Sequence, residues 1–166
     1  RLTKWKGQEM FLDALANLKE IYKKDNFHAI ILGSDQGRNV YSKKLIVSTE
    51  RHRIKNKVSF IKNCKDMPSA YKLADVVVSS SIEPEAFGRV AVEAQAMEKP
   101  IIASNIGGSK ETILNGRSGV LFKSEDAKNL ANVLNNFMEQ DKEELELMGK
   151  EGRKNIIKKF NVDQMC

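Results

Sequence analysis

Residues 75–104 read DVVVSSSIEPEAFGRVAVEAQAMEKPIIAS, and this stretch decides the fold of the chain. Its first part, DVVVSSS, predicts a short buried strand, and its last part, KPIIAS, predicts another strand near Pro100. The residues between them, GRVAVEAQAM (88–97), predict a helix. A helix that connects two strands of one sheet makes them parallel, with a right-handed crossover. The stretch therefore predicts a β-α-β unit and an α/β protein.

The rest of the chain repeats this alternation of helices and short apolar strands. Residues 8–24 carry apolar side chains at steps of three and four, which predicts an amphipathic helix. Further helices are predicted at 41–54, 67–74, 109–113, 124–139 and 141–159, and further strands at 27–33, 58–61 and 118–122. Ser124 and Asp141 are the expected N-caps of the last two helices. The order predicts a Rossmann-like, doubly wound parallel sheet, in which ligands bind beyond the carboxyl ends of the strands.

Length and composition indicate one domain, residues 1–166, with 41% hydrophobic residues. No apolar run approaches the roughly 20 residues of a membrane helix. The cysteines, Cys64 and Cys166, lack metal-ligand spacing, which fits a reducing cytoplasm and gives no metal site. We expect a cytoplasmic protein, with the inner face of the membrane as an open alternative. The chain begins without a strand before RLTKWKG (1–7) and stops in NVDQMC (161–166), where an amphipathic segment begins, so we expect a piece truncated at both ends.

The net formal charge of +6 comes largely from three basic runs, at 41–44, 51–57 and 153–159. Such runs attract phosphates, anionic membranes or nucleic acid, but many are ordinary solvated surfaces. A basic, non-enzymatic module that binds nucleic acid or an anionic membrane is therefore one hypothesis for the function. Only 7% of the residues are aromatic, which disfavours a stacking platform for nucleic acid bases.

Several familiar catalytic motifs are absent from the sequence. It has no GxxxxGK[ST] phosphate loop, and GSDQGR (33–38) lacks the GxGxxG spacing of dinucleotide-binding proteins. The sequence has two histidines, His28 inside a predicted strand and His52 in a basic run. Neither position favours a Ser/His/Asp catalytic triad. We expect His28 to be a packed or edge-strand residue.

Glu85 and Glu93 point to a binding site around the predicted helix at 88–97. Gly88 lets the backbone approach a ligand, and the unpaired N–H groups of the first helical turn suit a phosphate. Eight helical residues span about 12 Å, so the two carboxylates cannot bind the same atom but can bind two ends of an elongated ligand with sugar hydroxyls. Arg1 and Lys6 are candidate cations for its phosphates. The alternative is that these glutamates are ordinary surface acids, Glu85 complementing the helix dipole.

Three segments resemble a known family. RLTKWKG (1–7), EAFGRVAVEA (85–94) and KPIIASNIGGSKETI (99–113) resemble, in order, motifs of the second domain of retaining, nucleotide-sugar-dependent glycosyltransferases with the GT-B fold. The resemblance implies the C-terminal, donor-binding half of such an enzyme, which moves a hexosyl unit from a UDP-sugar or GDP-sugar without a metal. The saccharide or lipid-linked acceptor would bind an N-terminal domain that is absent here, so the fragment alone would be inactive. Cell-envelope polysaccharide or lipopolysaccharide synthesis is the expected setting.

The resemblance also implies roles for individual residues. Arg1 and Lys6 would bind the donor diphosphate and stabilise the leaving nucleoside diphosphate, and Glu85 would bind the sugar hydroxyls. Glu93 would bind the ribose. The remaining expected donor contacts are Ala86, Phe87, Gly88 and Arg89 beside the sugar and phosphates, with Lys62, Asn63 and Gly33 as further nucleotide contacts. Gly107 and Gly108 form a turn that would border the donor sugar. Trp5 is as readily a residue at the edge of the core as a ligand contact.

Overall fold

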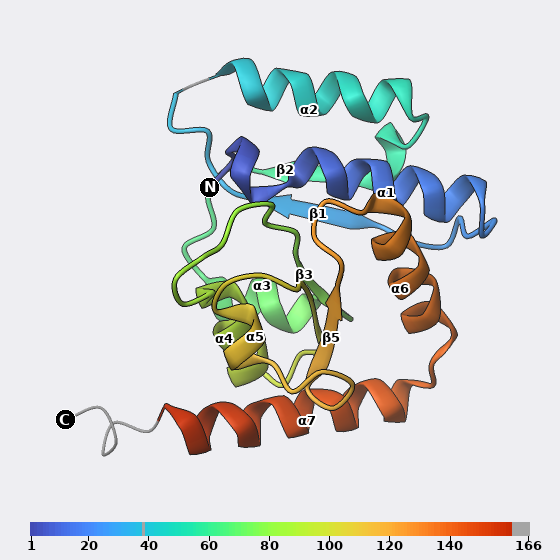
Figure 1. Ribbon diagram of the computed structural model, residues 1–166. Coiled ribbons are helices and arrows are strands. Elements are labelled where there is room, and N and C mark those ends of the chain that lie inside the picture. Colours follow the sequence, from blue (N-terminus) through green and yellow to red (C-terminus); the bar gives the residue numbers. More distant parts are fainter. Residues whose placement is uncertain (38, 161–166) are drawn as a thin grey trace.

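The computed structural model describes residues 1–37 and 39–160, and its helices and strands alternate along the chain (Figure 1). The helices are α1 (Gln8–Glu20), α2 (Asn39–Arg51), α3 (Met67–Leu73), α4 (Arg89–Ala96), α5 (Ser109–Thr112), α6 (Ala127–Glu139) and α7 (Lys142–Lys159), and the short 3-10 helices are η1 (Lys4–Lys6) and η2 (Lys55–Lys57). The strands are β1 (Ala29–Leu32), β2 (Val58–Ile61), β3 (Val77–Ser79), β4 (Ile101–Ser104) and β5 (Gly119–Phe122). The predicted α/β class is confirmed.

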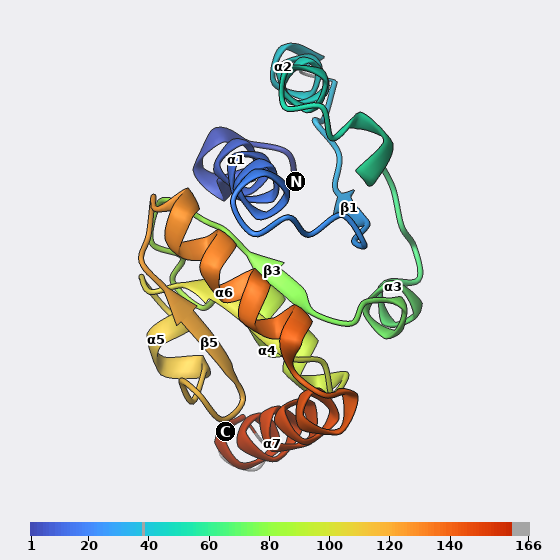
Figure 2. The ribbon, with the colours of Figure 1, turned by 90° about the vertical axis from the view of Figure 1, so that its right-hand side faces the viewer.

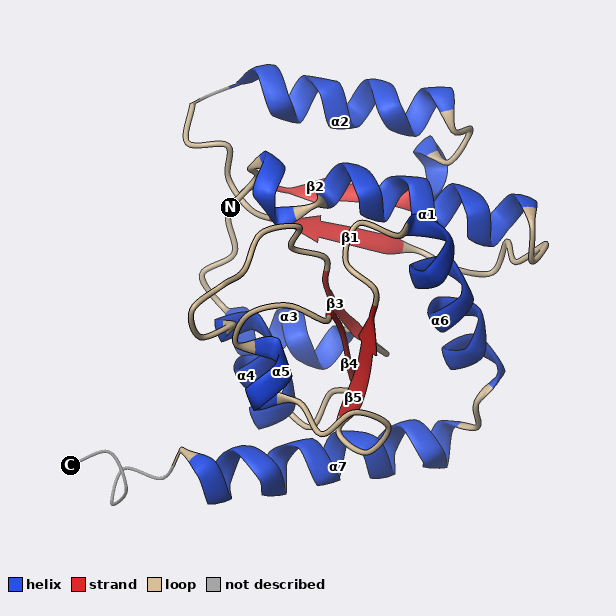
Figure 3. Cartoon of the chain, viewed as in Figure 1, coloured by secondary structure: helices blue, strands red, loops and turns tan. Residues whose placement is uncertain are grey.

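The strands form two parallel sheets instead of one (Figure 3). β1 pairs with β2, and β4 pairs with both β3 and β5. β1 and β3 do not pair, and the N-terminal segment lies between their carboxyl ends. The N–H of Leu2 donates to the carbonyl of Ser34 after β1 at 3.0 Å, and the N–H of Ile82 after β3 donates to the carbonyl of Trp5 at 2.8 Å. This segment therefore connects the two sheets at the edge where parallel α/β proteins bind ligands.

One hydrophobic core spans both sheets, because α1 and α6 pack side by side across them (Figures 1 and 2). Leu12 and Leu18 of α1 are fully buried, together with Leu130 of α6 and Ile102 of β4. A smaller apolar cluster lies under α4 and α5 and contains Tyr71, Ala91, Ala94, Ile101, Ala103 and Ile113. The apolar periodicity of α1 thus places its buried face as predicted.

The last helices differ from the prediction in one cap. α6 begins at Ala127, and its N-cap is Asp126, whose carboxylate accepts the N–H of Asn129 at 2.9 Å. The prediction of Ser124 as N-cap is wrong, because a cap must immediately precede the first helical residue. Asp141 does precede α7, although its side chain makes no capping hydrogen bond.

Two other expectations concern the ends of segments. α1 ends at Glu20, four residues earlier than expected, and Lys23 adopts a positive φ of 57° that is incompatible with a continuing helix. The expected amphipathic segment at 161–166 lies outside the described residues.

No helix that the structure describes is long and apolar enough to span a bilayer.

Candidate functional site

The first part of the site is the turn that carries Lys6. The Ser80 hydroxyl, after β3, donates to the carbonyls of Lys6 and Gly7 at 3.1 and 3.3 Å. Gly7 has a φ of 67°, and a Cβ at this position would lie 1.9 Å from the carbonyl oxygen of Ser80. Only glycine fits such a close backbone approach. The Lys-Gly pair is thus fixed against the carboxyl end of β3.

Lys6 and Glu85 form an ion pair in this position. The Lys6 Nζ lies 2.7 Å from the Glu85 Oε1, and the two side chains are only 21% and 18% exposed. The hydroxyl of Ser81 donates to the same carboxylate oxygen. The Lys6 Nζ also lies 4.5 Å from the ring centroid of Trp5, within cation–π range. Two of the three residues predicted to be catalytic, Lys6 and Glu85, therefore meet here, and they contact Trp5 and Ser81.

The loop that carries Glu85 is supported by Gly107 and Gly108. The N–H of Gly108 donates to the carbonyl of Glu85 at 2.8 Å. A Cβ at Gly107 would lie 2.5 Å from that carbonyl oxygen, and a Cβ at Gly108 would lie 2.7 Å from the carbonyl carbon of Phe87. These glycines therefore do more than form a turn, because they allow two backbone segments to pack directly together.

A cavity of about 420 Å³ opens where this loop enters α4. Gly88 precedes α4 with a φ of 71° and provides no capping side chain, so the first amide groups of α4 have no side-chain partner at the helix start. The cavity is lined by Trp5, Pro84, Glu85, Ala86, Phe87, Gly88 and Arg89. Glu85 and the four residues after it, all of them predicted site residues, thus line one cavity with Trp5 and Pro84.

Glu93 lies one helical turn beyond Arg89 and does not line this cavity. Its Oε2 accepts a hydrogen bond of 2.7 Å from the hydroxyl of Tyr71, a buried residue of α3. Burial, this hydrogen bond and the charge of Glu93 raise the pKa of Tyr71 above its ordinary value. Tyr71 was missed in the sequence, since its ring reads simply as an apolar position of a short helix.

The remaining predicted residues lie at the carboxyl ends of β1 and β2. A Cβ at Gly33 would lie 2.9 Å from the backbone nitrogen of Arg1, so these two residues are neighbours. The N–H of Gly33 donates to the carbonyl of Ile61 at 2.9 Å, immediately before Lys62 and Asn63. None of these four predicted residues lines the cavity beside Glu85.

Asp35, in the loop after β1, is a buried carboxylate that sequence reasoning did not single out. It accepts hydrogen bonds from the hydroxyl of Ser42 at 2.7 Å and from the N–H of Gly37 at 3.1 Å. Both bonds lower the pKa of Asp35, and the charge of Lys62 acts in the same direction. Asp35 therefore fixes the loop beside the expected nucleotide contacts.

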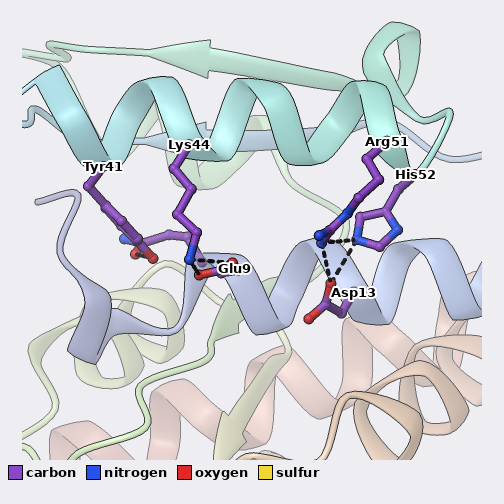
Figure 4. Close-up of polar contacts among 7 residues, drawn as sticks. Glu9, Asp13, Tyr41, Lys44, Arg51 and His52 are labelled. Atoms are coloured by element: carbon purple, nitrogen blue, oxygen red, sulfur yellow. Dashed lines mark hydrogen bonds and ion pairs between the residues drawn. The ribbon is translucent and has the colours of Figure 1, made fainter.

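Two of the basic runs are largely neutralised by carboxylates on neighbouring elements. Figure 4 shows α2 beside α1, where Lys44 pairs with Glu9 at 2.8 Å and His52 contacts Asp13 at 2.7 Å. Further pairs join Arg51 to Asp13, Lys55 to Glu50 and Lys57 to Asp25. Most of the basic side chains at 41–44 and 51–57 are thus paired with carboxylates of the chain itself.

The described residues give the site a defined chemistry. A partly buried cation and the start of a helix can bind an anion, and an adjacent carboxylate can accept hydrogen bonds from hydroxyl groups. Among residues 1–37 and 39–160, no group of three or more His, Cys, Asp or Glu side chains is placed to hold a metal ion.

The raised pKa of Tyr71 predicts a pH-dependent contribution to stability. Because the folded state holds this proton more tightly than the unfolded state, the contribution is complete below the ordinary pKa of 10.0 and falls as the pH rises above it. We expect Tyr71→Phe to lower the free energy of unfolding by about 1 kcal/mol at neutral pH. The difference from the unmodified chain should shrink at pH values above about 10.

Urea denaturation of both chains at neutral and alkaline pH measures this difference. A constant difference across the range would contradict a raised pKa of Tyr71 in the folded chain.

Comparison with known proteins identifies the family of the chain. The family model described as glycosyl transferases group 1 matches residues 1–155. The D-inositol 3-phosphate glycosyltransferase of Corynebacterium urealyticum is 33% identical over 144 residues, which cover 85% of this chain and 34% of that protein. The chain therefore spans about a third of the length of this relative.

Solved structures share the fold over almost the whole chain. Alr3699/HepE of Anabaena, crystallised with UDP and glucose, superposes with a TM-score of 0.90 at 31% identity, over 99% of this chain and 44% of that one. The C-terminal domain of LpcC from Francisella tularensis, a glycosyl transferase group 1 family protein, superposes with a TM-score of 0.84 at 25% identity, over 98% and 83% of the two chains. The chain belongs to the glycosyl transferases group 1 family, with a domain of the GT-B fold.

Proposed function

We propose that this chain is the donor-binding half of a retaining glycosyltransferase, which transfers a hexosyl unit from a nucleoside-diphosphate sugar to an acceptor bound by another domain. The observation that carries the proposal is the ion pair between Lys6 and Glu85, whose carboxylate lines the cavity at the start of α4. The binding of UDP and glucose by the similar HepE supports it. The match to the C-terminal domain of LpcC supports the assignment to one half of a larger enzyme.

The diphosphate would bind between Lys6 and the first amide groups of α4. Helix N-termini favour anions, and a cation that is only 21% exposed acts in an environment where water screens it weakly. Charge develops on the leaving nucleoside diphosphate during transfer, so preorganised positive charge at this place would lower the barrier. Arg1 would add a second cation from the N-terminal side.

Lys6 and Glu85 would each exchange the other for a group of the donor when the donor binds. Without a ligand, the ammonium of Lys6 compensates the carboxylate of Glu85 at 2.7 Å. A bound donor would offer phosphate oxygens to Lys6 and sugar hydroxyls to Glu85, so both side chains would exchange one polar partner for another. Neither charge would then lie unpaired in the partly buried site, a state that is costly.

The nucleoside would extend from the cavity toward Glu93. Eight residues separate the two glutamates, so Glu93 would accept the ribose hydroxyls while Glu85 accepts those of the hexose. Tyr71 would keep the carboxylate of Glu93 oriented through its 2.7 Å hydrogen bond. Lys62, Asn63 and Gly33 would lie on the side of the base, which we take to be uracil or guanine.

The reaction would proceed without a metal, because Lys6, Arg1 and the start of α4 supply the positive charge that a bound cation supplies elsewhere. The setting would be cell-envelope polysaccharide or lipopolysaccharide synthesis in the cytoplasm, with a saccharide or lipid-linked acceptor. The chain alone would bind the donor without transferring its sugar.

The alternative of a basic module for nucleic acid gains no support from the fold. The cations at 44, 51, 55 and 57 all have carboxylate partners within the fold. Nucleic acid binding depends on cations that are available to neutralise phosphates. We therefore assign no role in nucleic acid binding to the basic runs at 41–44 and 51–57.

Replacement of Lys6 tests the diphosphate site. Lys6→Met should weaken the binding of UDP, or of GDP if guanine is the base, by about 10- to 100-fold, because a charge-assisted contact to the phosphates is lost. Isothermal titration calorimetry measures the affinity. Lys4→Met, an exposed lysine in the same 3-10 helix, is the matched control and should bind as the unmodified chain does.

Equal nucleotide affinity in the Lys6→Met and Lys4→Met variants would show that the phosphates bind elsewhere. Thermal melting of both variants verifies that the fold is intact.

Replacement of Glu85 tests the sugar site separately. Glu85→Gln removes the carboxylate that would accept the sugar hydroxyls and should raise the Kd for UDP-glucose about 10-fold relative to the Kd for UDP. Glu83→Gln, two residues earlier and exposed, should leave the ratio of the two constants unchanged. An unchanged ratio in Glu85→Gln would contradict contact between Glu85 and the sugar.

A further inference from the structure

The third basic run lies on the second half of α7, where Arg153 and Lys154 have carboxylate partners in Glu98 and Glu151. Five of the residues from Lys150 to Lys159 are basic and one, Glu151, is acidic, a net formal charge of +4. Lys150 and Lys158 make no ion pair with any residue that the structure describes. Basic residues in a last helical turn stabilise the helix dipole, but Lys150 and Lys154 lie too far from the helix end for that effect.

A cavity of about 640 Å³ adjoins this half of α7, at the loop that precedes β5. Its polar lining includes four cations and one carboxylate: Arg117, Lys154, Lys158, Lys159 and Glu151. Glu151 accepts hydrogen bonds from Lys154 at 2.8 Å and from Arg117 at 3.0 Å, and so holds both cations at the cavity. The excess of positive charge favours an anionic occupant.

Apolar side chains flank these cations on the outer face of the helix. Leu147 is 60% exposed and Ile157 is 55% exposed. At 100° per residue, Lys150 and Lys154 lie between them around the helix axis, on the side opposite the buried Met148, Gly152 and Ile156. Lysines are attracted to anionic lipid headgroups, and exposed apolar side chains beside them add buried apolar area at a membrane interface.

The position of α7 leaves this face open. Figures 1 and 2 both show α7 along one edge of the molecule, with no element of the described chain packed on its outer side. Its inner side packs on α4, where a Cβ at Gly149 would lie 1.9 Å from the carbonyl oxygen of Glu98. This close packing on α4 fixes the orientation of the outer face of α7.

We propose that the outer face of the second half of α7, together with Arg117, docks on a membrane surface that contains anionic phospholipids, with lipid phosphates entering the adjoining cavity. A soluble phosphate would use the cations but would leave Leu147 and Ile157 exposed, whereas a bilayer interface would cover them. The proposal refines the membrane contact expected for a lipid-linked acceptor, and it does not depend on which donor binds.

The docked face is also connected to the donor site. Phe160, immediately after α7, packs edge-on against Phe87 with ring centroids 5.2 Å apart. Phe87 lines the cavity beside Glu85. The end of the helix proposed to dock on the membrane therefore contacts the loop proposed to hold the donor sugar.

Flotation of the full chain with vesicles tests this docking. At low salt the chain should float with phosphatidylcholine vesicles that contain phosphatidylglycerol and stay in solution with vesicles of phosphatidylcholine alone. Lys154→Glu/Lys158→Glu should weaken binding to the anionic vesicles by at least about 10-fold, because each cation near an anionic surface adds to the affinity. Lys43→Glu/Lys128→Glu makes the same charge change on α2 and α6, where both lysines are exposed, and should keep most of the binding.

A second variant, Leu147→Gln/Ile157→Gln, separates a bilayer from a soluble anion. It should weaken vesicle binding. In a Lys6→Met background, which removes the cation of the proposed donor site, it should leave the binding of inorganic pyrophosphate, measured by calorimetry, unchanged. The proposal is overturned if the chain does not bind anionic vesicles, if the two charge-reversal variants lose binding equally, or if the apolar variant binds vesicles as before. Calorimetry with UDP on the same samples measures binding at the donor site. If the chain binds anionic vesicles but not UDP, only the proposed function is contradicted.

Discussion

The candidate site depends on the short N-terminal segment that lies between the two sheets. The N–H of Leu2 donates to the carbonyl of Ser34 after β1, and the carbonyl of Trp5 accepts the N–H of Ile82 after β3. Since β1 and β3 do not pair with each other, these contacts and the α1–α6 packing fix the relative position of the sheets. Gly7 completes the arrangement by direct contact with the Ser80 carbonyl, which sets Lys6 beside Glu85.

The site consists of polar contacts between loops that meet at one edge of the sheets. Lys6, Ser81 and Gly108 each bind Glu85 or its backbone, and they come from the N-terminal segment, the β3–α4 connection and the β4–α5 connection. Parallel sheets bring such connections together at one edge, so residues far apart in the sequence converge. The loops form a defined site because glycines 7, 107 and 108 permit backbone contacts that a side chain would prevent.

Much of this was predictable from the sequence, and the exceptions have physical causes. The alternation of apolar runs predicts the class and nearly all elements, and the Glu85 to Arg89 cluster follows from local spacing. The separation of the sheets depends on hydrogen bonds between residues 2 to 5 and two distant loops, which no local pattern encodes. The Tyr71–Glu93 bond and the pairing of Lys44 with Glu9 are likewise contacts between helices that only tertiary structure creates.

A crystal structure of the chain with bound UDP-glucose tests the central claim most directly. The account predicts a diphosphate at the start of α4 within hydrogen-bonding distance of the Lys6 ammonium, with Glu85 on the hexose hydroxyls and Glu93 on the ribose. A nucleotide bound elsewhere, with the Lys6–Glu85 pair unchanged and the cavity beside Trp5 empty, would contradict it.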